Sequence, residues 1–138
     1  MSVHDGDTVL CLDEDNGQRK VRLVGIDAPE TGQAFGTKSR DALRALVLEK
    51  SVTVHVEGED RYGRLLGSLE IDGDDVALRM LTAGLAWHFK RFSDDEELAA
   101  AERNARAARR GLWADPEPVP PWEFRASEKE RRRQPVTR

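Results

Sequence analysis

The ten residues 21–30 constrain the fold more than any other part of the chain. The first six alternate as a strand does, with one set of side chains expected on each face: Val21, Leu23 and Gly25 against Arg22, Val24 and Ile26. Pro29 has no N–H for a ladder and disfavours helical geometry at Ala28, so the strand must end in an extended turn. Asp27 and Glu30 therefore stand at its exit, and loops held by rigid strands often carry working residues.

Two further motifs contain side chains of the same kinds. Asp5 and Asp7 lie upstream in DGDTV (5–9), and Arg64 lies downstream in DRYGR (60–64). If carboxylates and arginines converged, they would form a metal-assisted phosphodiester site, because oxygen ligands suit calcium or magnesium and guanidinium groups match phosphate oxygens. Taken singly, each motif also fits a turn, a strand end or a surface cation.

Six short motifs, in this order and rough spacing, resemble the staphylococcal nuclease family (thermonucleases). They are DGDTV (5–9), VRLVGIDAPE (21–30), FG (35–36), DRYGR (60–64), GLAW (84–87) and GLW (111–113), and the resemblance covers residues 5–124. It implies an α+β fold, an OB-fold barrel of five strands with three α-helices. Only four residues precede DGDTV, which predicts a truncated or unusually short first strand.

The resemblance also assigns roles at the expected site. It implies calcium as the cofactor, bound by Asp7, Asp27 and the backbone carbonyl of Ala28, with Asp5 nearby in contact through water. Glu30 would orient or deprotonate the attacking water as general base. Arg22 and Arg64 would hold the phosphate as charge develops on it.

The residues that bind the nucleotide are harder to assign. By resemblance, Tyr62 would lie near the terminal phosphate or sugar of the substrate. Phe92, in HFKRF (88–92), is the candidate for stacking on a base, and Lys90 adds local positive charge. Packing in the core is the alternative for the aromatic residues of this region: Trp87, Phe89 and Phe92.

Hydrophobic periodicity and turn residues predict the elements. Strands are expected at 8–12, 18–26, 51–57, 64–71 and 85–89, and helices at 37–50, 76–83 and 93–110. A proline-rich extended segment follows, which Trp122 and Phe124 are expected to hold against the barrel. The nuclease domain would span residues 1–125, and the charged tail 126–138 would be disordered or form a solvated helix.

Charge is distributed unevenly along the 138 residues. The net charge is −4, yet residues 101–138 carry ten basic and six acidic side chains. Phosphate affinity is mostly electrostatic, so local rather than global attraction to nucleic acid is expected. Arg131, Arg132 and Arg133 would contact nucleic acid or simply be solvated.

The single cysteine, Cys11, excludes an internal disulfide and is expected to be buried. No apolar run reaches the ~20 residues of a membrane span.

The expected function is a calcium-dependent endonuclease that hydrolyses DNA and RNA, preferentially single-stranded, and leaves 3′-phosphate ends. The cleavage polarity, like a secreted or periplasmic location, comes from the resemblance alone. A monomer is expected. The alternative is a non-catalytic OB module that binds nucleic acid or protein. Such modules are expected to lose the metal-binding aspartates or the arginines, whereas this chain retains them.

Overall fold

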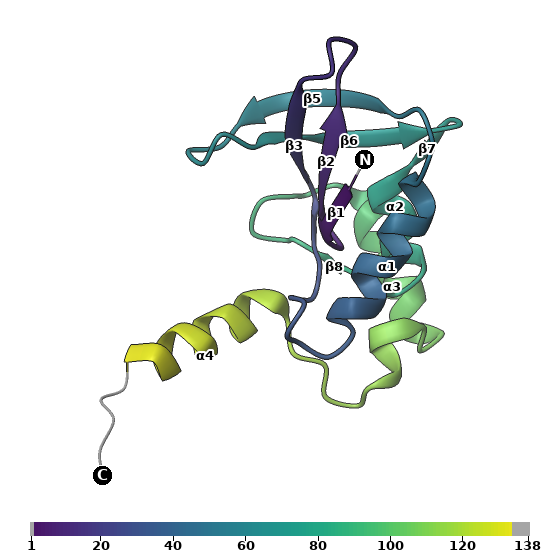
Figure 1. Cartoon of the computed structure of the whole chain (residues 1–138). Coiled ribbons are helices and arrows are strands. Elements are labelled where there is room, and N and C mark those ends of the chain that lie inside the picture. Colours follow the sequence, from purple (N-terminus) through teal and green to yellow (C-terminus); the bar gives the residue numbers. More distant parts are fainter. Residues whose placement is uncertain (1, 134–138) are drawn as a thin grey trace.

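The computed structural model describes residues 2–133, which form short strands with helices between and after them (Figure 1). In chain order the elements are β1 (Ser2–Asp5), β2 (Thr8–Leu12), β3 (Gln18–Leu23), β4 (Ile26–Asp27), α1 (Gly36–Val47), β5 (Thr53–Glu59), β6 (Leu65–Ile71), β7 (Asp74–Asp75), α2 (Val76–Thr82), β8 (Trp87–His88), α3 (Glu96–Ala107), the 3₁₀ turn η1 (Gly111–Ala114) and α4 (Pro121–Arg133). No helix in this part of the chain is long and apolar enough to cross a membrane.

The main sheet is mixed and has the strand order β1-β2-β3-β6-β5, with β7 paired to β6. Among the strands of residues 2–133 only β3 and β6 run parallel, while β4 and β8 form a separate two-stranded sheet. The α+β class is as expected, but the expected closed barrel of five strands with three helices is not what residues 2–133 form. Within that range no pairing joins the edge strands β1 and β5, and a fourth α-helix follows the proline-rich segment. The first strand is present as β1, four residues long.

The strand predicted over residues 18–26 is interrupted. Gly25 has a φ of +85°, a conformation that side chains disfavour, and a Cβ at this position would lie 2.5 Å from Leu98 Cδ1. The turn at Val24 and Gly25 shifts the alternation by one residue. Ile26 is consequently buried, although it was expected on the face opposite to the buried Leu23. The same turn lets β4 pair with β8, which leaves Asp27 buried opposite Trp87.

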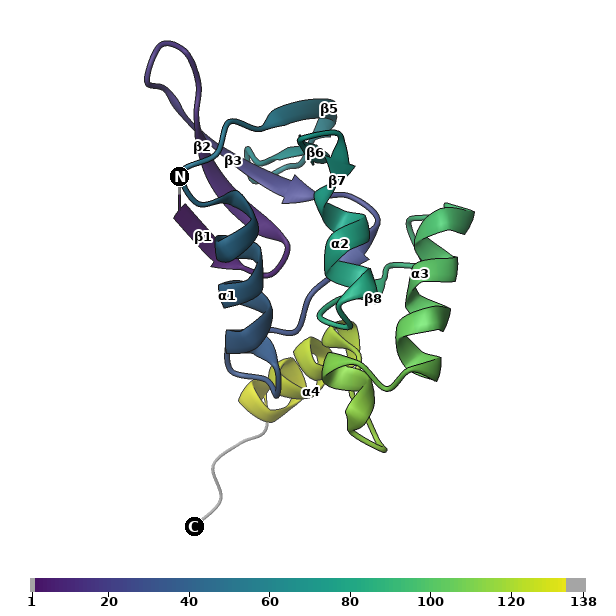
Figure 2. The same cartoon turned by 90° about the vertical axis from the view of Figure 1, so that its right-hand side faces the viewer.

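Three helices cover the sheet and lie side by side in Figure 2: α1, α2 and α3. Leu43 and Val47 of α1 are buried, as its periodicity predicts. The α3 helix begins later than expected, because Asp95 and not Ser93 is the N-cap, accepting from the N–H groups of Glu97 (2.9 Å) and Leu98 (3.1 Å).

The C-terminal helix α4 crosses residue 126, where the tail was expected to begin. Pro121 occupies its first position, where the missing N–H costs nothing. Trp122 packs edge-on against Trp87 and stacks on Phe89, at centroid distances of 5.5 and 5.7 Å. These contacts fix the first turn of α4, while its later turns project away from the body (Figure 1). Residues 126–133 are thus helical, one of the two expected states, and residues 134–138 lie outside the described range.

Candidate active site

The turn between β1 and β2 is held against the exit of β4. Asp7 is buried, and its Oδ2 accepts a hydrogen bond from the Ala28 N–H (2.8 Å) while Oδ1 accepts from the Thr8 hydroxyl (2.9 Å). A Cβ on Gly6 would lie 1.8 Å from Ser39 Oγ, so only glycine lets the DGDTV turn approach Ser39 of α1 this closely. The DGDTV turn and the Asp27–Pro29 turn therefore form one unit.

Arg22 bridges the two buried aspartates. Its Nη2 lies 3.4 Å from Asp7 Oδ2 and 3.4 Å from Asp27 Oδ1, and its Nη1 donates to the carbonyls of Leu23 and of Ile26, the latter at 2.9 Å. Burial would raise the pKa of Asp7. The positive charge of Arg22 and the hydrogen bonds that the Asp7 carboxylate accepts nevertheless hold that pKa below its usual value. Burial and the interaction with Asp7 raise the pKa of Asp5 to about 8.

Arg125 of α4 is a site residue that the sequence reasoning missed. Its Nη2 and Nη1 lie 2.6 and 3.1 Å from Asp27 Oδ2 and Oδ1, and Nη1 also donates to Glu30 Oε1 at 2.9 Å. Burial raises the pKa of Asp27 despite this pairing, and the hydrogen bond to Asp27 raises the pKa of Arg125. The sequence feature that could have predicted α4 is Pro121, because proline is favoured as the first residue of a helix and the residues after it are compatible with one.

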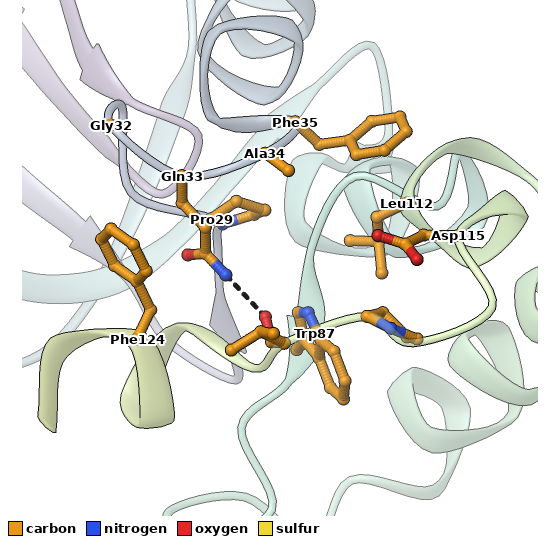
Figure 3. A pocket seen from close by; sticks show the side chains of 11 residues that line it. Pro29, Gly32, Gln33, Ala34, Phe35, Trp87, Leu112, Asp115 and Phe124 are labelled. Atoms are coloured by element: carbon orange, nitrogen blue, oxygen red, sulfur yellow. Dashed lines mark hydrogen bonds between the residues drawn. The ribbon is translucent and has the colours of Figure 1, made fainter. Parts of the chain in front are cut away.

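Glu30 stands on a braced loop. Its N–H donates to Gln33 Oε1 (3.1 Å). Gln33 Nε2 in turn donates to the carbonyl of Val119 (2.6 Å), the bond that Figure 3 marks. An apolar cavity of about 240 Å³ lies between this loop and the proline-rich segment, lined by residues that include Phe35, Trp87 and Phe124 (Figure 3). The hydrogen bonds of Gln33 thus tie the loop to the proline-rich segment. The Glu30 side chain is half-exposed and paired with Arg125.

Arg64 is placed by the β3–β6 register. Arg22 lies opposite Leu66, so Arg64, two residues earlier, belongs to the same face of the sheet as Arg22. Asp60 holds Arg64, with its Oδ2 2.7 Å from Arg64 Nε and its Oδ1 2.9 Å from the Arg64 N–H. Hydrogen bonds from Arg64 lower the pKa of Asp60 despite some desolvation. The sequence reasoning did not single out Asp60.

The three expected nucleotide contacts have different surroundings. Tyr62 is 70% exposed, and its ring centroid lies 6.0 Å from the Arg64 guanidinium. Phe92 is 71% exposed, but the cavity it lines also contains acidic side chains: Glu57, Asp75, Asp94 and Asp95. Lys90 Nζ is bound to Glu102 at 2.7 Å. Phe89, for which packing in the core was the alternative, lines a cavity with Lys90, Arg91, Trp122 and Arg125.

The residues present offer the chemistry of a hard cation site. Asp7 and Asp27 supply carboxylate oxygens, which calcium prefers, and the burial of both favours a nearby positive charge. Within residues 2–133 no three His, Cys, Asp or Glu side chains gather closely enough to hold a metal, and Arg125 occupies both oxygens of Asp27. The donor set fits calcium, but a cation on Asp27 must share its oxygens with Arg125 or displace it.

The comparison with known proteins decides the family. Residues 20–115, well over half of the chain, match the family model described as staphylococcal nuclease homologue. The chain belongs to the staphylococcal nuclease family. The motifs that the sequence shares with thermonucleases are therefore inherited rather than coincidental, and the family implies an OB-type α+β fold.

Proteins from bacteria and plants are similar to this chain. A Haemophilus influenzae protein named "Uncharacterized endonuclease" is 43% identical over 94% of this chain and 72% of its own length. An Escherichia coli O157:H7 protein of the same name is 44% identical over 89% of this chain and 80% of its own. A rice protein named as a probable staphylococcal-like nuclease is 44% identical over 77% of this chain, which matches 32% of that protein.

Proposed function

We propose that this member of the staphylococcal nuclease family is a calcium-dependent endonuclease that hydrolyses phosphodiester bonds of single-stranded DNA and RNA. The observation that supports the proposal most directly is the meeting of Arg22 with Asp7 and Asp27 at 3.4 Å each, beside a braced Glu30. Endonuclease is also the printed name of the two bacterial relatives.

In the proposed reaction Glu30 accepts a proton from a water molecule, whose oxygen attacks phosphorus. The bond from phosphorus to the 5′-oxygen breaks, the leaving oxygen takes a proton from solvent, and a 3′-phosphate remains. Arg22 keeps Asp7 and Asp27 charged and oriented through its Nη groups. Its Nε–H and the Nη groups of Arg64, whose Nε is bound to Asp60, would stabilise charge on the phosphate oxygens. Calcium bound by Asp7, Asp27 and the Ala28 carbonyl would polarise the phosphate and offset its charge.

Cleavage of a fluorescently labelled single strand tests the proposal. We expect cutting with calcium, and loss of cutting when a chelator removes it, because Asp7 and Asp27 then lack the cation that the phosphate needs. Cutting that persists in chelator would contradict the calcium dependence. If a folded protein binds calcium and the oligonucleotide yet cuts neither DNA nor RNA, the chain is the non-catalytic OB module.

Replacing Arg125 by glutamine is expected to strengthen calcium binding about tenfold. The guanidinium holds both oxygens of Asp27, and a charge-assisted hydrogen bond contributes about 1.5–3 kcal/mol that a cation must overcome. Isothermal titration with calcium measures the change directly. Arg131→Gln, on the same helix but paired to Glu128, serves as the matched control. An unchanged or weaker calcium affinity in Arg125→Gln would show that the Arg125 guanidinium and calcium do not compete for Asp27.

Replacing Asp60 by asparagine is expected to lower kcat about 10- to 10²-fold. Asp60 fixes the Arg64 guanidinium, and small misplacements of a catalytic group have costs of this size. Steady-state cleavage of the single strand measures the effect, and Asp41→Asn, whose exposed side chain pairs with Arg40 and Arg44, is the control. A kcat equal to that of the control would mean that Arg64 needs no such support.

A further inference from the structure

An open groove runs from the Glu30 loop along α4. It has a volume of about 970 Å³, and Glu30, Gly32 and Phe124 form the end nearest the candidate site. Five of its lining side chains are basic: Arg125, Lys129, Arg131, Arg132 and Arg133. Only two are acidic, Glu30 and Glu128, so the groove is positive in a protein whose net charge is −4.

The basic side chains of the groove beyond Arg125 are all exposed. Arg131 is paired with Glu128 at 2.7 Å, whereas Lys129, Arg132 and Arg133 have no ion pair with any residue of the range 2–133. Charged runs on a helix are commonly just solvated. Here, however, they form the wall of a groove that opens onto the candidate general base.

The spacing along α4 places these cations in a row. Positions 125, 129 and 132 follow the i, i+4, i+7 pattern of a single helix face. At 1.5 Å per residue they span about 10 Å along the helix axis. Figure 1 shows α4 leading away from the sheet, so the row extends outward from the site.

We infer that this groove binds the sugar-phosphate backbone of the substrate strand as it leaves the active site. The occupant is a single strand of nucleic acid, held through its phosphates by Lys129, Arg132 and Arg133. Arg125 lies at the junction between groove and site, in contact with Asp27 and Glu30. The inference rests on the proposed nuclease function and adds a binding surface whose basic side chains lie outside the residues matched by the family model, 20–115.

Binding is measured in a Glu30→Gln background with chelator, so that no cutting occurs. The probe is a fluorescein-labelled oligothymidylate, followed by anisotropy at several salt concentrations. The groove variant combines Lys129→Ala, Arg132→Ala and Arg133→Ala, changes that favour helix and remove no described contact of the core. The matched control removes the same charge from Arg19, Lys20 and Lys50, which are exposed and away from α4.

We expect the groove variant to bind roughly tenfold or more weakly than the control. The slope of log K against log salt concentration should be less steep by about two. Each lost phosphate contact on a single strand contributes about 0.7 to that slope, and the variant lacks the three cations proposed to make such contacts. Equal affinities and slopes for the two triple variants overturn the inference. Circular dichroism of both variants verifies that the helix content is retained.

Cleavage assays separate this inference from the proposed function. With Glu30 restored, the groove variant should keep kcat and show a raised KM on long strands. If the unsubstituted protein cuts nothing but the groove variant still loses oligonucleotide binding, the groove is supported and the nuclease proposal fails. If the unsubstituted protein cuts and both triple variants have the same KM, the groove inference fails and the nuclease proposal stands.

Discussion

Replacing Glu30 by glutamine is expected to lower kcat by about 10²- to 10⁴-fold, the contribution of a positioned general base. Glutamine keeps the size of the side chain and can still contact Arg125, but its amide cannot take a proton from water. The loop should keep its shape, because Gln33 binds the backbone N–H of Glu30 and not its side chain. Single-turnover cleavage of a labelled strand measures the chemical step without product release.

The matched control for this change is Glu123→Gln. Glu123 lies on α4, is exposed and loses the same charge. Its rate should stay near that of the unsubstituted protein, and both variants should melt at nearly the same temperature. A Glu30→Gln rate within a few-fold of the control would remove Glu30 from the chemistry and assign proton transfer to another group.

Replacing Arg22 by methionine is expected to reduce the free energy of unfolding by about 3–5 kcal/mol, the usual cost of leaving a buried charge without its partner. Asp7 and Asp27 are both buried, and Arg22 contacts both, while of these two aspartates Arg125 contacts Asp27. Methionine fills similar space but supplies no charge, so Asp7 loses its cation. Urea unfolding in chelator measures the change, and cleavage should also be lost.

Arg19→Met provides the comparison for Arg22. It lies on the same strand, but its side chain is exposed, and substitutions of that kind usually change stability by less than about 0.5 kcal/mol. If both variants unfolded at the same urea concentration, the buried aspartates would have to be stabilised by something other than Arg22.

The fold could be predicted closely where local chemistry decides it. Alternation and apolar spacing gave the positions of most strands and of three helices. The strand ends that were predicted wrongly share a cause, because contacts with residues distant in the sequence decide where a strand begins and ends. β8 has two residues instead of five because β4 offers it only Ile26 and Asp27. β3 stops early because Leu98, far along the chain, packs against Gly25.

The sequence by itself determined the chemical inventory of the site. Pro29 must end its strand, so Asp27 and Glu30 must stand at the exit, and the order of motifs identifies the family. Only the tertiary structure decided what surrounds those groups. Arg125 reaches Asp27 because Trp122, one turn earlier in α4, packs on Trp87 and Phe89, and no local pattern encodes the partner of an exposed helix. Burial of the aspartates then makes each charge depend on neighbours that lie up to 98 positions away in the chain.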